Sequence, residues 1–313
     1  MAGKRRYENL DQAKTTGSFR EFVKWQQERR RKVKDLSYVV PQADRVDIEF
    51  LRANRTETTI TWIGHATFLI QLSGLNILTD PVWANRMGFE KRLAPPGLAL
   101  TELPAIDAVL ISHSHYDHLH FRSLRRLKGS PLHMVPAGLR SLFRKKRLPR
   151  TEEFGWWESR KIGRVEFHFV PAQHWSKRTL WDTNRSHWGG WVVTNGRETV
   201  YFAGDSGYFR GFHEIGRRFA VDAALLPIGA YEPEWFMSPQ HVTPEEAVQA
   251  YLDVGADTFV PMHYGAFRLA DDTPREALDR LQAEWARRGL PSSRLRILKH
   301  GETIRLSTGA DGQ

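Results

Sequence analysis

The sequence of 313 residues contains no cysteine. This absence excludes disulfide bonds and any metal site that uses thiolate ligands. Long apolar runs are also missing, because no hydrophobic stretch approaches the length of a membrane span and none follows the basic residues at the amino end. We therefore expect a cytoplasmic protein.

The chain also lacks the features that divide a protein into several units. It has no linker rich in Pro, Gly or Ser, no internal repeat and no low-complexity stretch, and 41% of its residues are hydrophobic. A chain of this size can bury a sizeable core. We predict one domain over residues 55–313, preceded by a basic helical extension over residues 1–54 that packs on or near it.

Acidic residues are fewer than basic ones, 36 against 46, which gives a net charge of +10. Such an excess is compatible with nucleic acid or an anionic membrane as partner, although charge runs are usually solvated faces. Residues 18–36 predict a helix with Phe19 and Phe22 near one side and basic residues elsewhere, as in helices that lie on membranes. The pattern favours peripheral contact with the inner face of the membrane over nucleic acid. Docking against the domain is the alternative, and the oligomeric state is left open.

What the chain does have is a cluster of histidines within eight residues. Imidazoles crowded beside a carboxylate repel one another when protonated, so a bound cation is their natural organiser. A solvated loop that happens to be rich in histidine is the alternative. The cluster has the spacing His-x-His-x-Asp-His and comprises His113, His115, Asp117 and His118, with His120 just beyond.

The surroundings of the cluster predict a loop between a strand and a helix. Residues 106–112 form a short apolar run that is typical of a buried strand. Residues 121–127 carry an apolar side chain at every third position, as an amphipathic helix does. Open α/β sheets usually place their functional sites at such carboxyl ends of strands.

Three further predicted strands also end at a candidate ligand. Residues 165–173 lead into His174, residues 199–204 into Asp205, and residues 258–262 into His263. Five imidazoles and two carboxylates are enough for two metal ions, which could be zinc, iron or manganese. We assign His113, His115 and His174 to the first ion, Asp117, His118 and His263 to the second, and Asp205 as the bridge.

These ligands lie in longer motifs that resemble a known superfamily, the metallo-β-lactamase fold hydrolases. Within it, the chain resembles the phospholipases D that hydrolyse N-acylphosphatidylethanolamine, over about residues 55–306. The motifs are Trp-Ile-Gly-His-Ala-Thr at 62–67, Pro-Ala-Gln-His-Trp at 171–175, Lys-Arg-Thr-Leu at 177–180, Phe-Ala-Gly-Asp-Ser-Gly-Tyr at 202–208, Pro-Ile-Gly-Ala-Tyr-Glu-Pro at 227–233, Gln-His-Val at 240–242 and Leu-Lys-His-Gly-Glu at 298–302. One departure is Ser176, where the animal enzymes carry cysteine.

The resemblance implies a fold of the α/β (α+β) class, a four-layer αββα sandwich with two mixed β-sheets flanked by helices. It also implies two zinc ions and a phosphodiesterase that acts on a phospholipid or another small phosphodiester. A metal-bridging hydroxide would attack phosphorus and release N-acylethanolamine and phosphatidic acid. Asp117 would then be both ligand and catalytic residue.

Three further residues have supporting roles in this hypothesis. His241, in the Gln-His-Val motif, is the candidate for stabilising the phosphate or protonating the leaving alkoxide. Its alternative is a structural histidine that caps a helix beginning near Pro244. Asp80 matches the early aspartate of the superfamily and is expected to orient the metal loop, and His65 is expected to act similarly.

Aromatic residues near the ligands suggest an apolar groove for acyl chains, with ordinary core packing as the alternative. A lactonase or a nuclease with the same metal site remains the enzymatic alternative, and a non-catalytic binding protein is the third hypothesis. The candidate substrate-binding residues are Trp181, Trp188, Tyr231, Trp235 and Phe236.

Overall fold

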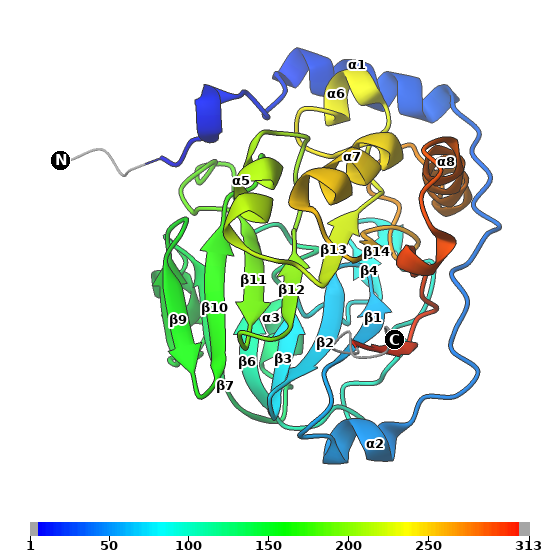
Figure 1. The fold of residues 1–313 in the computed structure, drawn as a ribbon. Coiled ribbons are helices and arrows are strands. Elements are labelled where there is room, and N and C mark those ends of the chain that lie inside the picture. The colour runs from blue at the N-terminus through cyan, green and yellow to red at the C-terminus, as the bar shows by residue number, and fades with distance from the viewer. Residues whose placement is uncertain (1–5, 307–313) are drawn as a thin grey trace.

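The computed structural model of the chain describes residues 6–306. Two β-sheets lie face to face, and helices cover the outer side of each (Figure 1). Each sheet contains both parallel and antiparallel neighbours. The four-layer αββα sandwich that the sequence predicts is confirmed.

The first sheet has seven strands in the order β15-β1-β2-β3-β6-β7-β8. Neighbouring strands are antiparallel from β15 to β3 and parallel from β3 to β8. The strands are Thr59–Gly64 (β1), Thr67–Leu72 (β2), Leu75–Thr79 (β3), Ile106–Leu110 (β6), Gly129–Pro136 (β7), Thr151–Phe154 (β8) and Thr303–Arg305 (β15). Strand β6 lies within the run predicted before His113.

The second sheet has six strands in the order β14-β13-β12-β11-β10-β9, antiparallel from β9 to β12 and parallel from β12 to β14. The strands are Ser159–Ile162 (β9), Val165–Val170 (β10), Gly190–Thr194 (β11), Thr199–Phe202 (β12), Ala223–Pro227 (β13) and Thr258–Met262 (β14), and a separate hairpin joins Arg86–Met87 (β4) to Glu90–Lys91 (β5). Strands β10, β12 and β14 lie within the three runs predicted to end at ligands.

Alternation of side chains along the strands divides the hydrophobic core in two. On β2, Phe68 and Ile70 belong to the larger core, together with Phe167 of the second sheet. Leu69, between them in sequence, points to the other face and packs in a smaller core with Phe143. This period of two is what a strand with both faces buried requires, and it holds the strand ends that carry the ligands in a rigid frame.

Helices α1 (Phe19–Arg31), α2, α7 and α8 each begin with a residue whose side chain caps the helix. Helix α7 has Thr243 as its N-cap, and the Thr243 hydroxyl accepts a hydrogen bond from the backbone N–H of Glu246. Helix α3 is shorter than the predicted 121–127. The helices are Ile48–Ala53 (α2), Phe121–Leu124 (α3), Arg140–Lys145 (α4), Gly211–Arg218 (α5), Glu234–Met237 (α6), Pro244–Val254 (α7) and Pro274–Arg287 (α8), with 3₁₀ turns at Leu10–Gln12 and Ser292–Arg294.

Helix α1 (Phe19–Arg31) lies beside α6 at one end of the sandwich (Figure 1). The buried ring of Trp25 stacks on Phe236 of α6, with ring centroids 5.3 Å apart. Phe19 and Phe22, by contrast, are 81% and 44% exposed. The helix therefore docks against the domain through Trp25, as one of the two sequence hypotheses expected, while Phe22 contacts Trp25 and, like Phe19, stays partly or largely exposed.

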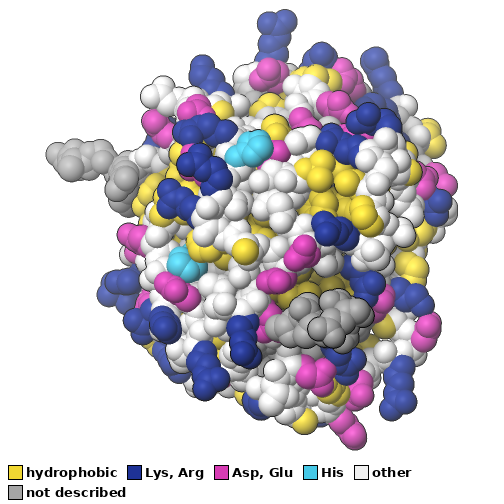
Figure 2. Space-filling view, viewed as in Figure 1, with side chains coloured by type: hydrophobic (Ala, Val, Ile, Leu, Met, Phe, Trp, Pro, Cys, Tyr) yellow, Lys and Arg dark blue, Asp and Glu magenta, His cyan; other side chains and the backbone are white. Residues whose placement is uncertain are grey.

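Basic and acidic side chains alternate over the surface that Figure 2 shows, and Lys and Arg do not gather into one stripe there. A continuous basic stripe is the usual footprint of a nucleic-acid site. Among residues 6–306, no helix is both long enough and apolar enough to cross a membrane.

Candidate metal centre

The segment after β6 folds into a tight loop that turns its polar side chains inward. The backbone N–H groups of His118 and Leu119 both donate to the carbonyl of His115, at 3.2 and 2.9 Å. At the start of the loop, the N–H of Ser112 donates to Oδ1 of Asp80 at 2.8 Å. The loop therefore presents its histidines and Asp117 to the ends of the neighbouring strands.

Three imidazoles form the first ligand group. Nε2 of His113 lies 2.9 Å from Nδ1 of His115, and Nε2 of His174 lies 3.2 Å from the same atom. One nitrogen from each ring falls within 4.8 Å of the other two. The structure thus brings together the three residues that the sequence assigned to a first metal ion.

The second group combines two imidazoles with a carboxylate. Nε2 of His118 lies 3.1 Å from Nε2 of His263, and Oδ2 of Asp117 lies 3.2 and 3.4 Å from these two nitrogens. Nε2 of His65 lies 3.0 Å from the same Asp117 oxygen. His65 is therefore placed to orient Asp117, which is the role expected for it.

Asp205 stands between the two groups. Its Oδ2 lies 3.2 Å from Nε2 of His118 and 3.8 Å from Nε2 of His174, while its Oδ1 lies 3.2 Å from Nε2 of His263. The preceding Gly204 has a φ of +63°, and a Cβ there would lie 2.6 Å from Cβ of Ser112. Glycine therefore lets the end of β12 approach the metal loop, so that one carboxylate can face both groups.

The residues present fit two divalent metal ions. Ring nitrogens in the two groups face one another instead of pairing with outside donors, and Oδ1 of Asp205 is buried without a hydrogen bond. Buried polar atoms of this kind normally have a partner. A set of five imidazoles and two carboxylates suits zinc, iron or manganese, so the fit does not select one metal.

Asp80 fixes the orientation of His118. Its buried carboxylate accepts a hydrogen bond from Nδ1 of His118 at 2.7 Å and from the hydroxyl of Ser112 at 2.5 Å. A proton on Nδ1 leaves the lone pair of Nε2 directed into the cluster. The structure therefore places Asp80 where the sequence expected a residue that orients the metal loop.

The charges differ between the two groups. Burial and neighbouring imidazoles hold the pKa of His113 well below its ordinary value, and burial lowers the pKa of His115 to about 4. Burial would also lower the pKa of His263, but the carboxylates of Asp205 and Asp117 raise it to about 9. The imidazoles of the first group are thus neutral and have lone pairs available for a metal ion. In the second group the carboxylates favour positive charge, which a metal ion would supply in place of protons.

His241 lies at the edge of the cluster. Its Nδ1 is 3.9 Å from Oδ2 of Asp205 and has no hydrogen-bond partner, and its ring stacks near that of His263. Burial lowers the pKa of His241 to about 4. Helix α7 is capped by Thr243, so His241 is not the helix cap that was its structural alternative.

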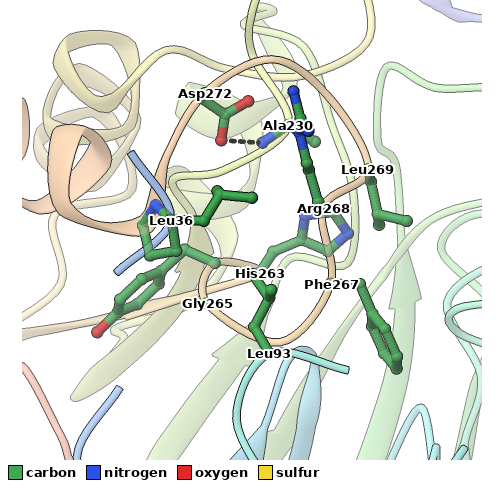
Figure 3. A pocket seen from close by; sticks show the side chains of 11 residues that line it. Leu36, Leu93, Ala230, His263, Gly265, Phe267, Arg268, Leu269 and Asp272 are labelled. Atoms are coloured by element: carbon green, nitrogen blue, oxygen red, sulfur yellow. Dashed lines mark hydrogen bonds between the residues drawn. The ribbon is translucent and has the colours of Figure 1, made fainter. Parts of the chain in front are cut away.

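A small pocket is lined by His263 together with residues of the loop that follows it (Figure 3). Asp272 points into it and accepts a hydrogen bond from the backbone N–H of Ala230 at 3.0 Å. The side chains of Leu36 and Arg268 also line the pocket. Its volume of about 10 Å³ is far too small for an acyl chain.

The five aromatic candidates do not share one surface. Trp181 and Trp235 are 77% and 42% exposed, whereas Trp188 and Tyr231 are fully buried and Phe236 packs under Trp25. The indole N–H of Trp188 donates to the carbonyl of Ala172 inside the protein. Trp188 and Tyr231 are thus core residues and offer no surface to a substrate here, which corrects the expectation for these two.

Sequence reasoning missed two polar residues that touch the site. Arg178 donates from Nη1 to the carbonyls of Ser114 and Leu119, at 2.6 and 3.0 Å, and its guanidinium lies over the ring of Tyr116. It therefore ties the segment after His174 to the metal loop. Asn9, near the amino end, contacts the backbone of His174. Only the quoted Lys-Arg-Thr-Leu motif hinted at the first of these, and nothing in the sequence pointed to the second.

Comparison with known proteins places this geometry in a family. The profile described as "Beta-lactamase superfamily domain" matches residues 75–264. The chain belongs to the beta-lactamase superfamily. Membership of this superfamily is what the motifs predicted, and the cluster of histidines and aspartates is able to bind metal.

Two sequence relatives and one solved structure illustrate the likeness. An uncharacterized protein of Mycobacterium tuberculosis is 39% identical over 246 residues, which cover 74% of this chain and 65% of that protein. N-acyl-phosphatidylethanolamine-hydrolyzing phospholipase D 1 of Caenorhabditis elegans is 35% identical over 244 residues, which cover 71% of this chain and 68% of that enzyme. The metallo hydrolase Igni18 of Ignicoccus hospitalis superposes with a TM-score of 0.61 at 23% identity, covering 80% of this chain and 99% of Igni18. The resemblance to this phospholipase D family is confirmed, and the chain spans just under two thirds of the mycobacterial relative.

Proposed function

We propose that this protein hydrolyses a lipid phosphodiester in a phospholipase D-type reaction, with two zinc ions in the cluster and N-acylphosphatidylethanolamine as the substrate class. The observation that carries the metal chemistry is Asp205, whose carboxylate lies 3.2 Å from His118 and His263 of the second group and 3.8 Å from His174 of the first. The choice of lipid rests on the likeness to the nematode phospholipase D.

The chain's own residues would hold the ions and orient their ligands. His113, His115 and His174 would hold one ion, and Asp117, His118 and His263 the other. His65 lies within the same second group, where we assign it to Asp117. When bound, two such ions act as Lewis acids and lower the pKa of water towards about 7. The frame behind the ligands, which includes Asp80 and His65, keeps the lone pairs of the ligands directed at the ions.

The charge of the site favours an anionic substrate. Only two carboxylates, Asp117 and Asp205, lie among the ligands. Two divalent ions would carry four positive charges, so the loaded site remains cationic and attracts a phosphodiester more strongly than a neutral lactone. This difference supports the phosphodiesterase over the lactonase alternative.

The reaction requires one bond to form and one to break at phosphorus. The oxygen of water forms the new P–O bond, the P–O bond to the ethanolamine group breaks, and the departing oxygen takes up a proton. His241 lies at the edge of the cluster, 12% of its side chain exposed. With a pKa lowered to about 4 by burial, it is neutral at pH 7. Its role would therefore be to offer an N–H hydrogen bond to the phosphate or the leaving oxygen, rather than a full charge.

Exposed aromatic residues support contact with the acyl part of a lipid. Trp181 follows Arg178 on the segment tied to the metal loop, and Trp235 lies on α6 beside α1. Phe19 and Phe22 on α1 add exposed apolar surface. Aromatic side chains give large contact area at small entropic cost, so these residues suit peripheral binding to a membrane that holds the substrate.

The test compares turnover of N-acylphosphatidylethanolamine, a simple aryl phosphodiester and an acyl lactone by the zinc-loaded protein. We expect both phosphodiesters to be cleaved and the lactone to be spared. Asp117→Ala should abolish cleavage, which ties the activity to the cluster. Cleavage of the lactone alone would contradict the proposal.

The lipid part of the proposal has a separate test. Trp181→Ala and Trp235→Ala should slow cleavage of the long-chain lipid while leaving the aryl phosphodiester unchanged. Trp157→Ala is a matched control, because Trp157 stacks against Arg218 and lies outside the proposed contact. If the ratio of the two cleavage rates in the Trp181 and Trp235 variants equalled that of the parent, the support for an acyl contact would be removed.

A further inference from the structure

The segment from Tyr7 to Thr15 lies against the loop that follows β10. The backbone N–H of Tyr7 donates to the carbonyl of Asn184 at 2.8 Å, and the ring of Tyr7 stacks on His187 with centroids 4.4 Å apart. Further along, Asp11 forms an ion pair with Arg210 at 2.7 Å. The amino-terminal segment is thus attached to the hydrolase domain at several points, and Asn9 lies between them.

Asn9 holds the backbone of His174 from both sides. Its Oδ1 accepts a hydrogen bond from the N–H of His174 at 3.0 Å, and its Nδ2 donates to the carbonyl of His174 at 2.9 Å. A side-chain amide has one acceptor and one donor side, so it can pair with a residue as a neighbouring strand would. Strand β10 ends at Val170, so His174 lies beyond the ladder and receives these bonds from Asn9 instead.

The contact is buried and reinforced. Asn9 is only 8% exposed. The indole N–H of Trp188 donates to the same Asn9 oxygen at 2.9 Å, and the hydroxyl of Thr15 donates to the same His174 carbonyl at 2.9 Å. Trp188, expected from the sequence to contact substrate, instead helps to keep the Asn9 amide in one orientation.

The ring of His174 is fixed as well as its backbone. Its Nδ1 lies 3.0 Å from the carbonyl of Gln240, which a proton on Nδ1 can bond. Nε2 then carries the lone pair that can bind a metal ion, and it lies 3.2 Å from Nδ1 of His115 in the first ligand group. Backbone and ring together therefore leave His174 a single position from which to bind a metal ion.

We propose that Asn9 is a positioning residue for the metal ligand His174. The amino-terminal segment would then contribute to metal binding by the first ligand group. This inference rests on the metal centre proposed above, but not on the identity of the substrate. It makes Asn9 the counterpart of Asp80, which orients His118 of the second group.

The experiment measures zinc affinity of the full-length protein by competition with a chromophoric chelator. Asn9→Ala should weaken the binding of one zinc ion by about 10- to 100-fold, the usual cost of losing a partner behind a ligand, and leave the other ion unchanged. Thr15→Val, which removes one of two donors to the His174 carbonyl, should show a smaller change in the same direction. It also provides the test if Asn9→Ala does not fold.

Three variants make the pattern specific. His174→Ala and His263→Ala define the titration curves expected when the first or the second group is damaged, and Asn9→Ala should resemble His174→Ala. Asp11→Ala is the matched control, because it loosens the same segment through its ion pair with Arg210 without touching His174. We expect its zinc affinity to stay within about twofold of the parent.

A purely structural role for Asn9 predicts a different result. The melting temperature would fall equally with and without zinc, and the increase in melting temperature that zinc produces would not change. A positioning role predicts a smaller zinc-induced increase, because stabilisation by a ligand follows its affinity. Unchanged zinc affinity in a folded Asn9→Ala protein would overturn this inference alone. A parent protein that bound none of zinc, iron and manganese would overturn the metal centre, and this inference with it.

Discussion

Two regions that bury carboxylates neutralise them differently. We call the first the metal cluster, the two ligand groups with Asp205 between them. The second is the helix clasp, in which fully buried Asp271 faces Nε of Arg29 at 3.7 Å and Nζ of Lys32 at 3.4 Å. Both cations belong to the extension and lie at and just after the carboxyl end of α1. In the clasp, the chain itself supplies the positive charge.

In the metal cluster the neighbours of Asp205 and Asp117 are imidazoles. Burial alone would lower the pKa of His263, but Asp205 and Asp117 raise it to about 9, so without a metal ion this ring balances the carboxylates only by binding a proton. Burying a carboxylate costs several kcal/mol unless an opposite charge compensates it. The comparison teaches that a buried carboxylate with an Arg or Lys partner indicates a structural contact, whereas one ringed by histidines indicates a site for an external cation.

The strongest test of this comparison removes the shared carboxylate. Asp205→Ala should reduce phosphodiesterase turnover and zinc content by more than the ~100-fold that loss of a partner behind a ligand costs, because both ions lose a ligand. Metal analysis and turnover of an aryl phosphodiester measure it. Asp222→Ala is the control, since Asp222 binds the N–H of Thr199 at the opposite end of β12. Full zinc content in Asp205→Ala would contradict the shared role.

The next effect concerns the residue behind the second group. Asp80→Ala should weaken zinc binding by about 10- to 100-fold, since His118 loses the acceptor that fixes its tautomer. Asp80→Asn should retain part of the affinity, because the amide oxygen can still accept that bond. Chelator competition would show the two losses, and equal affinity for both variants and the parent would argue against an orienting role.

A substitution in the helix clasp should lower the free energy of unfolding and leave zinc affinity unchanged. Arg29→Met takes one cation from buried Asp271, and we expect the free energy of unfolding to fall by about 2 kcal/mol, below the usual 3–5 kcal/mol because Lys32 remains. Denaturant unfolding of the zinc-loaded protein measures this change. Arg30→Met, at an exposed position of the same helix, should have little effect. A loss of zinc affinity in Arg29→Met would break the distinction between the two regions.

The smallest effect is expected at an ion pair near the surface, which serves as a reference for both regions. Hydrogen bonds from Arg287 and Arg288 lower the pKa of Glu284 from 4.5 to about 2. The stabilisation is therefore present above about pH 4.5 and is lost as the pH falls towards 2. Glu284→Gln should cost at most about 1 kcal/mol at pH 7, because Arg287 is largely exposed.

Unfolding curves at pH 7 and pH 3 provide the measurement for Glu284. The stability difference between the parent and Glu284→Gln should shrink at the lower pH. A difference that grew as the pH fell would contradict the assigned pKa direction.

Much of the site could be predicted because its ligands follow strands. The apolar runs before His113, His174, Asp205 and His263 identify the strands, and strands that end at the same edge of a sandwich bring their next residues together. The aromatic residues were harder. Trp188 and Trp181 look alike in sequence, yet one is fully buried and the other 77% exposed. Their difference depends on which segment packs over each.

The extension shows the same limit. An amphipathic helix with Phe22 and Trp25 on its apolar side suits a membrane or a protein surface equally well. The structure decides that Trp25 packs on Phe236. Asn9 gave no signal at all, because its role depends on a contact with a residue 165 positions away.

The sequence by itself determined the type of chemistry. Metal ligands must be residues of particular kinds, and their positions just after predicted strands can be recognised in the linear sequence. The tertiary structure alone decided how charge is balanced, which aromatics reach solvent and which segments brace the ligands. Each of these depends on contacts between distant segments, and such contacts are set by packing and burial rather than by any local pattern.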